Sequence, residues 1–448
     1  MNQVNSKRTL WAWAMYDFAN SAFTTLVVTF IYGPYFIKGI ATDELLGTKW
    51  WSWAISITAI IVSLLSPVLG ALSDAGGYRK WIMMLSTWCC VAATFFLCFP
   101  EQGQVLSALI LFVIANISFE FGTVFCNAYL PEIVSKDRIG RASGFAWALG
   151  YIGGLLALGL ALLIFVLPEI EFSILGRDFY LPTFSKILGF SSEEPFYWAE
   201  SGENIRATNL LVAFWFLIFS IPTFIWVKER KPEKRKFQES VSTSFKQLFY
   251  TFKELKNFRK VARFLLARLV YNDALVTIFA FGGIYAAGII GFSFAELMIL
   301  GIVLNITAGL GAFLMGFLDD SNGSQNIIQY SILFLCLACL LAIAAPIIPN
   351  WFNEISWLSP KYIFWFSAIL IGFFSGPNQS ASRSLMAHYT PAEKRNEFFG
   401  FYAFSGKATS FLGPLLFGWL TAIFDTQIAG IFVVLVLFIL GYFLMKRV

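Results

Sequence analysis

The 448-residue sequence has few charged side chains and almost no histidine. Charged residues make up 13% of the chain and His388 is its one histidine, whereas soluble domains carry about 25% charged residues. Hydrophobic residues reach 58%, with 50 Phe and 15 Trp. Lipid-facing helices and interfacial aromatic belts accommodate so much apolar surface, but water does not. The composition therefore predicts an integral membrane protein.

The sequence also lacks the motifs of catalytic and cofactor chemistry. No H-E-x-x-H, G-x-S-x-G or P-loop string occurs. All six cysteines fall in apolar runs, and Cys336-x-x-Cys339 has no second pair or histidine beside it, so packing explains it best. The net charge of +5 is small and lies in loops. We therefore expect no enzyme activity, no cofactor, no metal and no nucleic-acid partner.

Twelve apolar runs are long enough to cross a hydrocarbon core, which takes about 20 residues. Gly, Pro and charged residues separate nearly all of them. The first run is long and lacks a small-residue cleavage site, so we expect no cleavable signal peptide. The predicted spans are 12–37, 50–73, 81–100, 105–127, 144–167, 208–227, 262–290, 296–318, 326–349, 361–383, 397–424 and 427–445.

Lys and Arg gather in the loops on one side of the predicted bundle, together with both termini. The positive-inside rule therefore places both termini in the cytoplasm, and we expect a plasma or inner membrane. Segment 228–261 begins with many Lys and Arg and continues with apolar residues, so it is either a helix along the inner leaflet or a solvated tether. The acidic loop 168–206 is predicted to be a solvated cap; a substrate funnel is the alternative.

A phrase of the form G-x-L-x-D-x-x-G occurs twice, at 70–77 and 316–323, and each copy closes one predicted span and precedes another. Asp17 and Asp273 are 256 positions apart, and Asp74 and Asp320 are 246 apart. A nearly constant offset indicates an internal duplication. The predicted domains are a six-span half at 1–227, the basic linker 228–261 and a second six-span half at 262–448.

The repeated phrase resembles the signature loop between the second and third spans of the major facilitator superfamily. Longer strings resemble the "unknown major facilitator" or vacuole-effluxer-like family: YDFANSA at 16–22, NAYLPE at 127–132, SRS at 382–384 and FFGFY at 398–402. The resemblance implies an all-α fold of two pseudo-symmetric six-helix bundles, with a solute bound between them by alternating access. Its fungal vacuolar members imply efflux of amino acids.

Ionisable groups inside spans cost roughly 2.5–3.5 kcal/mol on insertion scales, so each needs an explanation. Glu120 falls near the midplane, and Asp17 lies about 9 Å inside the first span. If transport is coupled to H+, these two acids are the predicted proton carriers. The alternatives are an ion pair or helix–helix hydrogen bond for Asp17 and permanent neutralisation by a cation for Glu120. The predicted cavity residues are Asp17, Asn20, Asn116, Glu120, Asn127, Asn272, Asp273, Asn305, Asn378, Gln379 and Arg383.

The resemblance implies that the repeated loop is a gate that joins the halves on the cytoplasmic side. Asp74 and Asp320 can each cap a helix N-terminus or meet a basic loop, and the nearby basic residues are their expected partners. No cation follows the second copy, so we expect Asp74 to contribute more than Asp320. Lys407 falls near the midplane and either pairs with Glu120 or has a structural role. The predicted gating residues are Asp74, Arg79, Lys80, Arg138, Arg141, Asp320 and Lys407.

These features predict a monomeric secondary transporter that exports or exchanges small polar solutes, amino acids or related metabolites, within membrane lipid. Coupling to H+ is left open. One alternative is an uncoupled facilitator. The other is a transporter-like receptor or assembly protein that moves no solute.

Overall fold

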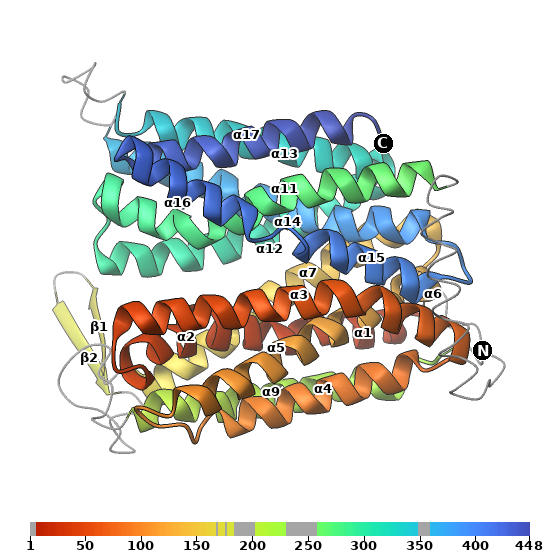
Figure 1. The fold of residues 1–448 in the computed structure, drawn as a ribbon, viewed down its shortest axis with the longest axis horizontal. Helices are drawn as coiled ribbons and strands as arrows, with labels where there is room; N and C mark the ends of the chain where they lie inside the picture. Colours follow the sequence, from red (N-terminus) through yellow and green to blue (C-terminus); the bar gives the residue numbers. More distant parts are fainter. Residues whose placement is uncertain (1–5, 167–168, 175–176, 183–201, 230–257, 348–358) are drawn as a thin grey trace.

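A computed structural model describes residues 6–166, 169–174, 177–182, 202–229, 258–347 and 359–448. Long helices run along the longest axis of the molecule (Figure 1). Both chain termini lie at one end of the bundle, here named the termini end. A two-stranded hairpin marks the opposite end, named the hairpin end.

The first half of the chain forms six membrane-length segments. They are α1 (Lys7–Ala22) continued by η1 (Phe23–Phe30), α2 (Tyr32–Tyr35) and η2 (Phe36–Ile40); α3 (Glu44–Gly76); α4 (Arg79–Phe96); α5 (Val105–Asn127) followed by α6 (Leu130–Ile133); η3 (Lys136–Arg138) leading into α7 (Ile139–Ala161) and η4 (Leu162–Val166); and α9 (Glu203–Trp226).

The second half repeats this arrangement. Its segments are α11 (Arg259–Tyr285) with η5 (Ala286–Ile290), α12 (Phe294–Asn322), α13 (Ser324–Ala344), α14 (Pro360–Tyr389), α15 (Arg395–Lys407) with α16 (Leu412–Phe424), and α17 (Gln427–Met445). The α15–α16 pair is one span broken at 408–411, where the sequence predicted a continuous helix.

Ten segments of the described chain are long and apolar enough to cross a membrane. The other two are α4, which is 18 residues long and begins with Arg79 and Lys80, and α14, which carries a polar run at 375–383. Together they make the predicted twelve, and the helical fold class is confirmed. Several helices extend beyond the predicted spans; α3, for example, begins at Glu44 instead of residue 50.

The described residues include one hairpin. Strands β1 (Glu169–Ile174) and β2 (Arg177–Pro182) pair antiparallel, with Glu169 opposite Pro182. This pair was not expected in a loop predicted to be a solvated cap. Most of loop 168–206, and residues 230–257 of the predicted linker, lie outside the described residues, so the alternatives for both segments stay open.

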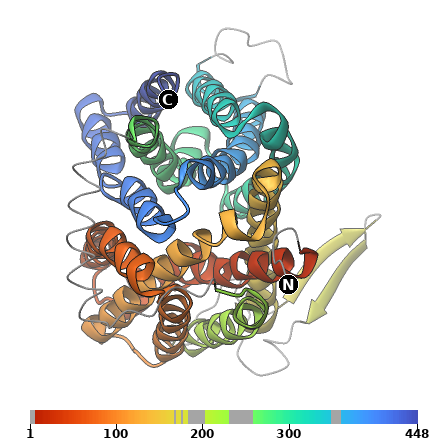
Figure 2. The ribbon, with the colours of Figure 1, turned by 90° about the vertical axis from the view of Figure 1, so that its right-hand side faces the viewer.

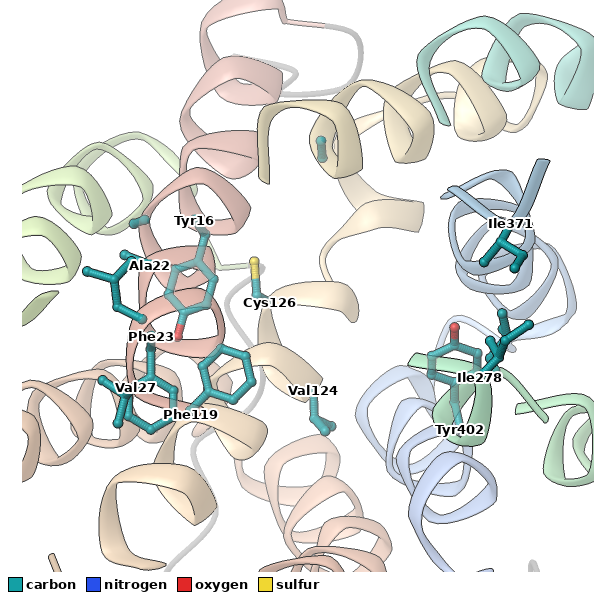
Figure 3. Packing of buried hydrophobic residues seen from close by; sticks show 14 of the residues in the cluster. Tyr16, Ala22, Phe23, Val27, Phe119, Val124, Cys126, Ile278, Ile371 and Tyr402 are labelled. Carbon is teal, nitrogen blue, oxygen red and sulfur yellow. The ribbon is translucent and has the colours of Figure 1, made fainter. Parts of the chain in front are cut away.

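Each half has its own apolar interior. Figure 3 shows Tyr16, Phe23 and Phe119 packed together inside the first half, where the rings of Phe23 and Phe119 stack with centroids 5.3 Å apart. Large apolar side chains such as Leu64, Ile225 and Phe443 point outward and are exposed. A helix satisfies its own backbone hydrogen bonds, so these outer faces suit a lipid solvent.

The two halves meet through two equivalent helix pairs, α3 with α15 and α7 with α12. Figure 2, which looks onto the termini end, shows the halves side by side. The first glycine of each repeated phrase lies at this contact: a Cβ on Gly70 would overlap the backbone of Asn396, and a Cβ on Gly316 would lie 3.2 Å from the Cα of Gly144, a less severe contact. The duplicated glycines therefore bring the halves together at the backbone level.

Candidate functional site

The first copy of the repeated phrase caps a helix of the opposite half. Asp74, near the end of α3, accepts hydrogen bonds from the backbone N–H of Asn396 (3.1 Å) and Glu397 (2.8 Å) and from the Asn396 side-chain amide (2.6 Å). These amides lie in the first turn of α15, where N–H groups have no intrahelical acceptor. Of the two alternatives left by the sequence, the structure has the helix cap and not the basic loop, because Asp74 points across the boundary.

The second copy makes the mirror-image contact. Asp320, near the end of α12, accepts from the backbone N–H of Gly140 (2.7 Å) and Arg141 (3.3 Å) at the start of α7, and it forms an ion pair with the Arg141 guanidinium. Arg141, one of the expected basic partners, thus pairs with Asp320; the expectation that this copy contributes less, because no cation follows it in sequence, did not allow for a cation from the first half. Both copies therefore join the halves.

A chain of three charges lies beside the Asp74 cap. Glu132 of α6 pairs with Arg79 of α4 at 2.8 Å and with Arg395 of α15 at 2.6 Å. Arg79 also donates to the carbonyl of Ala128 (3.1 Å). Glu132 belongs to a string that carries the family resemblance, but no role was predicted for it. Its position directly after Pro131, at the start of a short helix, could have marked it as a candidate contact residue. Glu132 thus links both halves at the termini end.

Two predicted gating residues stay within the first half. Lys80 donates to the carbonyl of Val227 (3.0 Å), and its backbone N–H donates to Glu229 (3.3 Å). Burial raises the pKa of the Glu229 carboxyl, and the Arg79 charge and the hydrogen bond from the Lys80 backbone N–H partly offset this rise. Arg138 pairs with the adjacent Asp137, and both side chains are exposed. As partners of Asp74, Lys80 and Arg138 were wrongly predicted.

Deeper in the bundle, Arg383 of α14 reaches into the first half. Its guanidinium pairs with Asp17 of α1 at 2.6 Å and donates to Asn127 (3.0 Å), to the hydroxyl of Ser143 (2.9 Å) and to the Ser143 carbonyl (2.8 Å). The rings of Trp13 and Trp147 lie 4.9 and 5.7 Å from the guanidinium carbon. Arg383 is 2% exposed. The structure thus unites three predicted cavity residues in a buried contact between the halves.

Polar contacts continue along the α7–α14 boundary. Ser143 donates to the Ser380 carbonyl (2.7 Å), and a ring nitrogen of His388 lies 3.0 Å from the Lys136 carbonyl oxygen. His388 belongs to the last turn of α14 and contacts the other half, although Pro391, three residues later, is typical of a loop.

At mid-depth, Glu120 of α5 and Lys407 of α15 form an ion pair of 2.6 Å across the halves. Lys407 stands twelve residues after Arg395, about 18 Å along the helix. Its side chain is 36% exposed and that of Glu120 is 16% exposed, so this pair is more open than the Asp17–Arg383 pair. The pairing that the sequence left open is therefore present, and Lys407 is the last helical residue before the break in α15–α16.

The remaining predicted cavity residues are dispersed. Gln379 donates to the hydroxyl of Tyr151 across the boundary (3.3 Å). Asn116 and Asn378 are buried. The other residues form hydrogen bonds within their own half: Asn20 with Thr123 (3.5 Å), Asn272 with the Gly406 carbonyl (2.9 Å), Asn305 with the Gly301 carbonyl (2.8 Å) and Asp273 with Thr409 (3.1 Å). The structure does not bring this set together in one place.

Two six-helix halves, joined by reciprocal helix caps at one end and by charge pairs in the interior, are the architecture of a major facilitator transporter. Solved structures share it. A human organic anion transporter, MFSD10 (TETRAN), superposes with a TM-score of 0.71 at 14% identity, covering 98% of this chain and 99% of that one. A bacterial homologue of the iron transporter ferroportin, in an outward-facing state, gives 0.67 at 11% identity, with 99% of each chain covered.

Sequence comparison gives the family. The chain belongs to the vacuole effluxer Atg22-like family, whose model matches residues 51–448. It is 26% identical over 434 residues to an uncharacterized MFS-type transporter, YxiO, of Bacillus subtilis, covering 96% of this chain and 92% of that protein. It is also 27% identical over 264 residues to Autophagy-related protein 22 of Yarrowia lipolytica, covering 54% of this chain and 44% of that protein. These relatives are transporters and not enzymes.

Proposed function

We propose that this transporter exports or exchanges small zwitterionic metabolites, amino acids among them, which bind between the halves. The Glu120–Lys407 pair carries this proposal. A zwitterion has one ammonium and one carboxylate, and these are the groups that a carboxylate and a Lys ammonium bind by charge-assisted hydrogen bonds. One bound solute therefore satisfies both side chains when they separate.

The Glu120–Lys407 pair also explains why a solute should bind before the conformation changes. Separating two partly buried charges without replacement leaves each unpaired, which costs several kcal/mol. A zwitterion between them restores a partner to each, so the loaded protein changes conformation more readily than the empty one. Such a difference favours exchange over leak. Gln379 and Tyr151, bonded across the same boundary, add neutral donors and acceptors that suit a polar solute.

Membrane orientation follows from the loop charges. The basic loops of the sequence lie at the termini end, so we assign that end to the cytoplasm and the protein to a plasma or inner membrane. The conformation described is then the one joined on the cytoplasmic side, through Asp74, Asp320 and Glu132. Export of a cytoplasmic solute requires these contacts to break and reform in each cycle.

Counterflow in proteoliposomes loaded with a panel of amino acids tests this function. We expect accumulation of at least one labelled zwitterion by the wild type. Glu120→Gln and Lys407→Gln each remove one charged partner of the solute, worth about 1.5–3 kcal/mol, so counterflow should fall by about tenfold to a hundredfold. The matched control is Glu101→Gln, which opens an ion pair with Arg206 inside the first half. Absence of flux for every solute would refute the proposal and favour a receptor role.

A further inference from the structure

Asp273 is a buried carboxylate without a cation. It lies in α11, is 3% exposed, and accepts a hydrogen bond from the Thr409 hydroxyl at 3.1 Å. In the described part of the chain, its carboxylate takes part in no ion pair. Asp17 and Glu120, the other two acids singled out within the spans, are both paired with cations. An ionised carboxylate deep in a membrane domain with one hydroxyl partner is strongly disfavoured.

The duplication explains how this carboxylate lost its cation. Asp273 lies 256 positions after Asp17, and Arg383 lies 256 positions after Asn127. The internal repeat therefore makes Asp273 the equivalent of Asp17, and Arg383 the equivalent of Asn127. Asp17 is neutralised by Arg383 from the opposite half. The position equivalent to Arg383 holds Asn127, a neutral amide. In the conformation described, one half of the molecule therefore has an ion pair where the other half has an acid bonded to a hydroxyl.

The neighbouring charged groups all have other partners or lie far along the helices. Arg268, earlier on α11, donates to the Tyr402 carbonyl (2.6 Å) and to Ser405 (2.9 Å). Lys407 of α15 pairs with Glu120. On α14, Arg383 faces the first half, His388 bonds to Ser384 and Lys136, and Lys361 pairs with Glu296 at the other helix end. Helices α16 and α17 contain no charged residue between their ends.

We propose that Asp273 is the site that binds and releases the proton coupled to transport. This rests on the proposed function and moves the coupling role from Glu120 and Asp17 to their cation-free counterpart. The proton comes from water on one side of the membrane, forms an O–H bond on the carboxylate, and returns to water on the other side. The protonated acid needs no cation and is compatible with the buried state described.

The broken helix α15–α16 connects this acid to the solute pair. Asp273 holds Thr409 in the break, and the adjacent Asn272 donates to the carbonyl of Gly406 (2.9 Å). Lys407 lies between these two anchors. Discontinuous helices place backbone and side-chain groups at coupling sites in transporters. Loss of the proton alters the contact of Asp273 with Thr409, two residues after Lys407, so the proton acts on the same break that positions the Lys407 side chain for Glu120.

Labelling with dicyclohexylcarbodiimide, which reacts with protonated carboxyl groups in apolar surroundings, tests the site without a solute. We expect mass spectrometry of the purified protein to find the adduct on Asp273 and not on the cation-paired Asp17 or Glu120. Labelling should decline as the pH rises and should vanish in Asp273→Asn. A wild type that stays unlabelled at Asp273 at every pH would overturn the proposal.

Transport assays separate the proposal from the function on which it rests. In Asp273→Asn we expect solute counterflow to persist while uptake driven by a pH gradient falls at least tenfold and pH dependence flattens. Glu101→Gln should keep both activities. Unchanged pH-driven uptake in Asp273→Asn, or a drive by Na+ that is independent of pH, would refute proton binding even if counterflow occurs. Absence of counterflow in the wild type would refute the transport function, and carbodiimide labelling would still decide the role of Asp273.

Discussion

Removing the charge of Asp17 should weaken the conformation in which the termini end is closed. All four hydrogen bonds of the Arg383 guanidinium go to the first half, and the substitution Asp17→Asn leaves this buried cation with neutral partners only. Breaking one partner of a buried pair costs about 3–5 kcal/mol. Once the halves separate, both side chains become hydrated, so the cost falls on the closed state. A loss of about 3 kcal/mol shifts the closed-to-open ratio by about a hundredfold.

Pulsed electron paramagnetic resonance between spin labels at Asp137 and Glu393 would measure that ratio, with the native cysteines replaced. Both positions are exposed at the termini end, one on each half. We expect Asp17→Asn to move population to a longer distance, and the double variant Asp17→Asn with Arg383→Met to move less, because no charge is then left unpaired.

The matched control opens an ion pair within one half. Lys361 and Glu296 pair at 2.8 Å between α14 and α12, so Lys361→Met should leave the label distance unchanged. If Asp17→Asn gives the wild-type distance distribution, the Asp17–Arg383 pair does not hold the halves together and the reasoning fails.

Three further outcomes follow from the contacts. Gly144→Ala should open the termini end and slow exchange, because its methyl group would overlap the Ala312 carbonyl. Gly159→Ala, on the same helix, meets no atom within 4 Å and should be neutral. Equal label distances in the two variants would contradict this prediction. Asp74→Ala and Asp320→Ala should each destabilise the closed state by about 1 kcal/mol through loss of a cap; a large difference between them in counterflow would restore the asymmetry predicted from the sequence. Tyr16→Phe should lower thermal stability by about 1 kcal/mol in a denaturation assay without altering label distance, since its hydrogen bond to Thr87 (2.8 Å) lies inside the first half.

Much of the fold could be predicted because its causes are local. The thickness of the membrane sets the length of each apolar run, so the number of spans could be counted from the sequence. The repeat offset is likewise a property of the chain alone, and it marked the glycines and acids of the repeated phrase as contact points. The break at 408–411 escaped prediction, because residues such as Thr409 and Ser410 are tolerated in intact helices, and the partners on α11 that favour a break are remote in sequence.

The candidate site was predicted only as a set of residue types. Charged groups within spans are costly wherever they lie, so Asp17, Glu120, Asp273, Arg383 and Lys407 could be selected individually. Their partners depend on which helix faces which, and the sequence carries no such information across more than 200 positions. The basic residues expected around Asp74 were chosen because they are close to it in sequence, whereas its actual partners, Asn396 and Glu397, are close to it only in space.

Hydrophobic length and internal repetition are read along one dimension, so a duplicated twelve-span membrane protein could be predicted from the sequence. Which groups meet depends on how the halves pack: both repeated acids cap helices of the opposite half, Arg383 neutralises Asp17, and Lys407 neutralises Glu120. Among the described residues Asp273 pairs with no cation, although its sequence context matches that of Asp17. Neutralisation of a charge is a property of three-dimensional neighbours, and those neighbours exist only after the two halves have packed together.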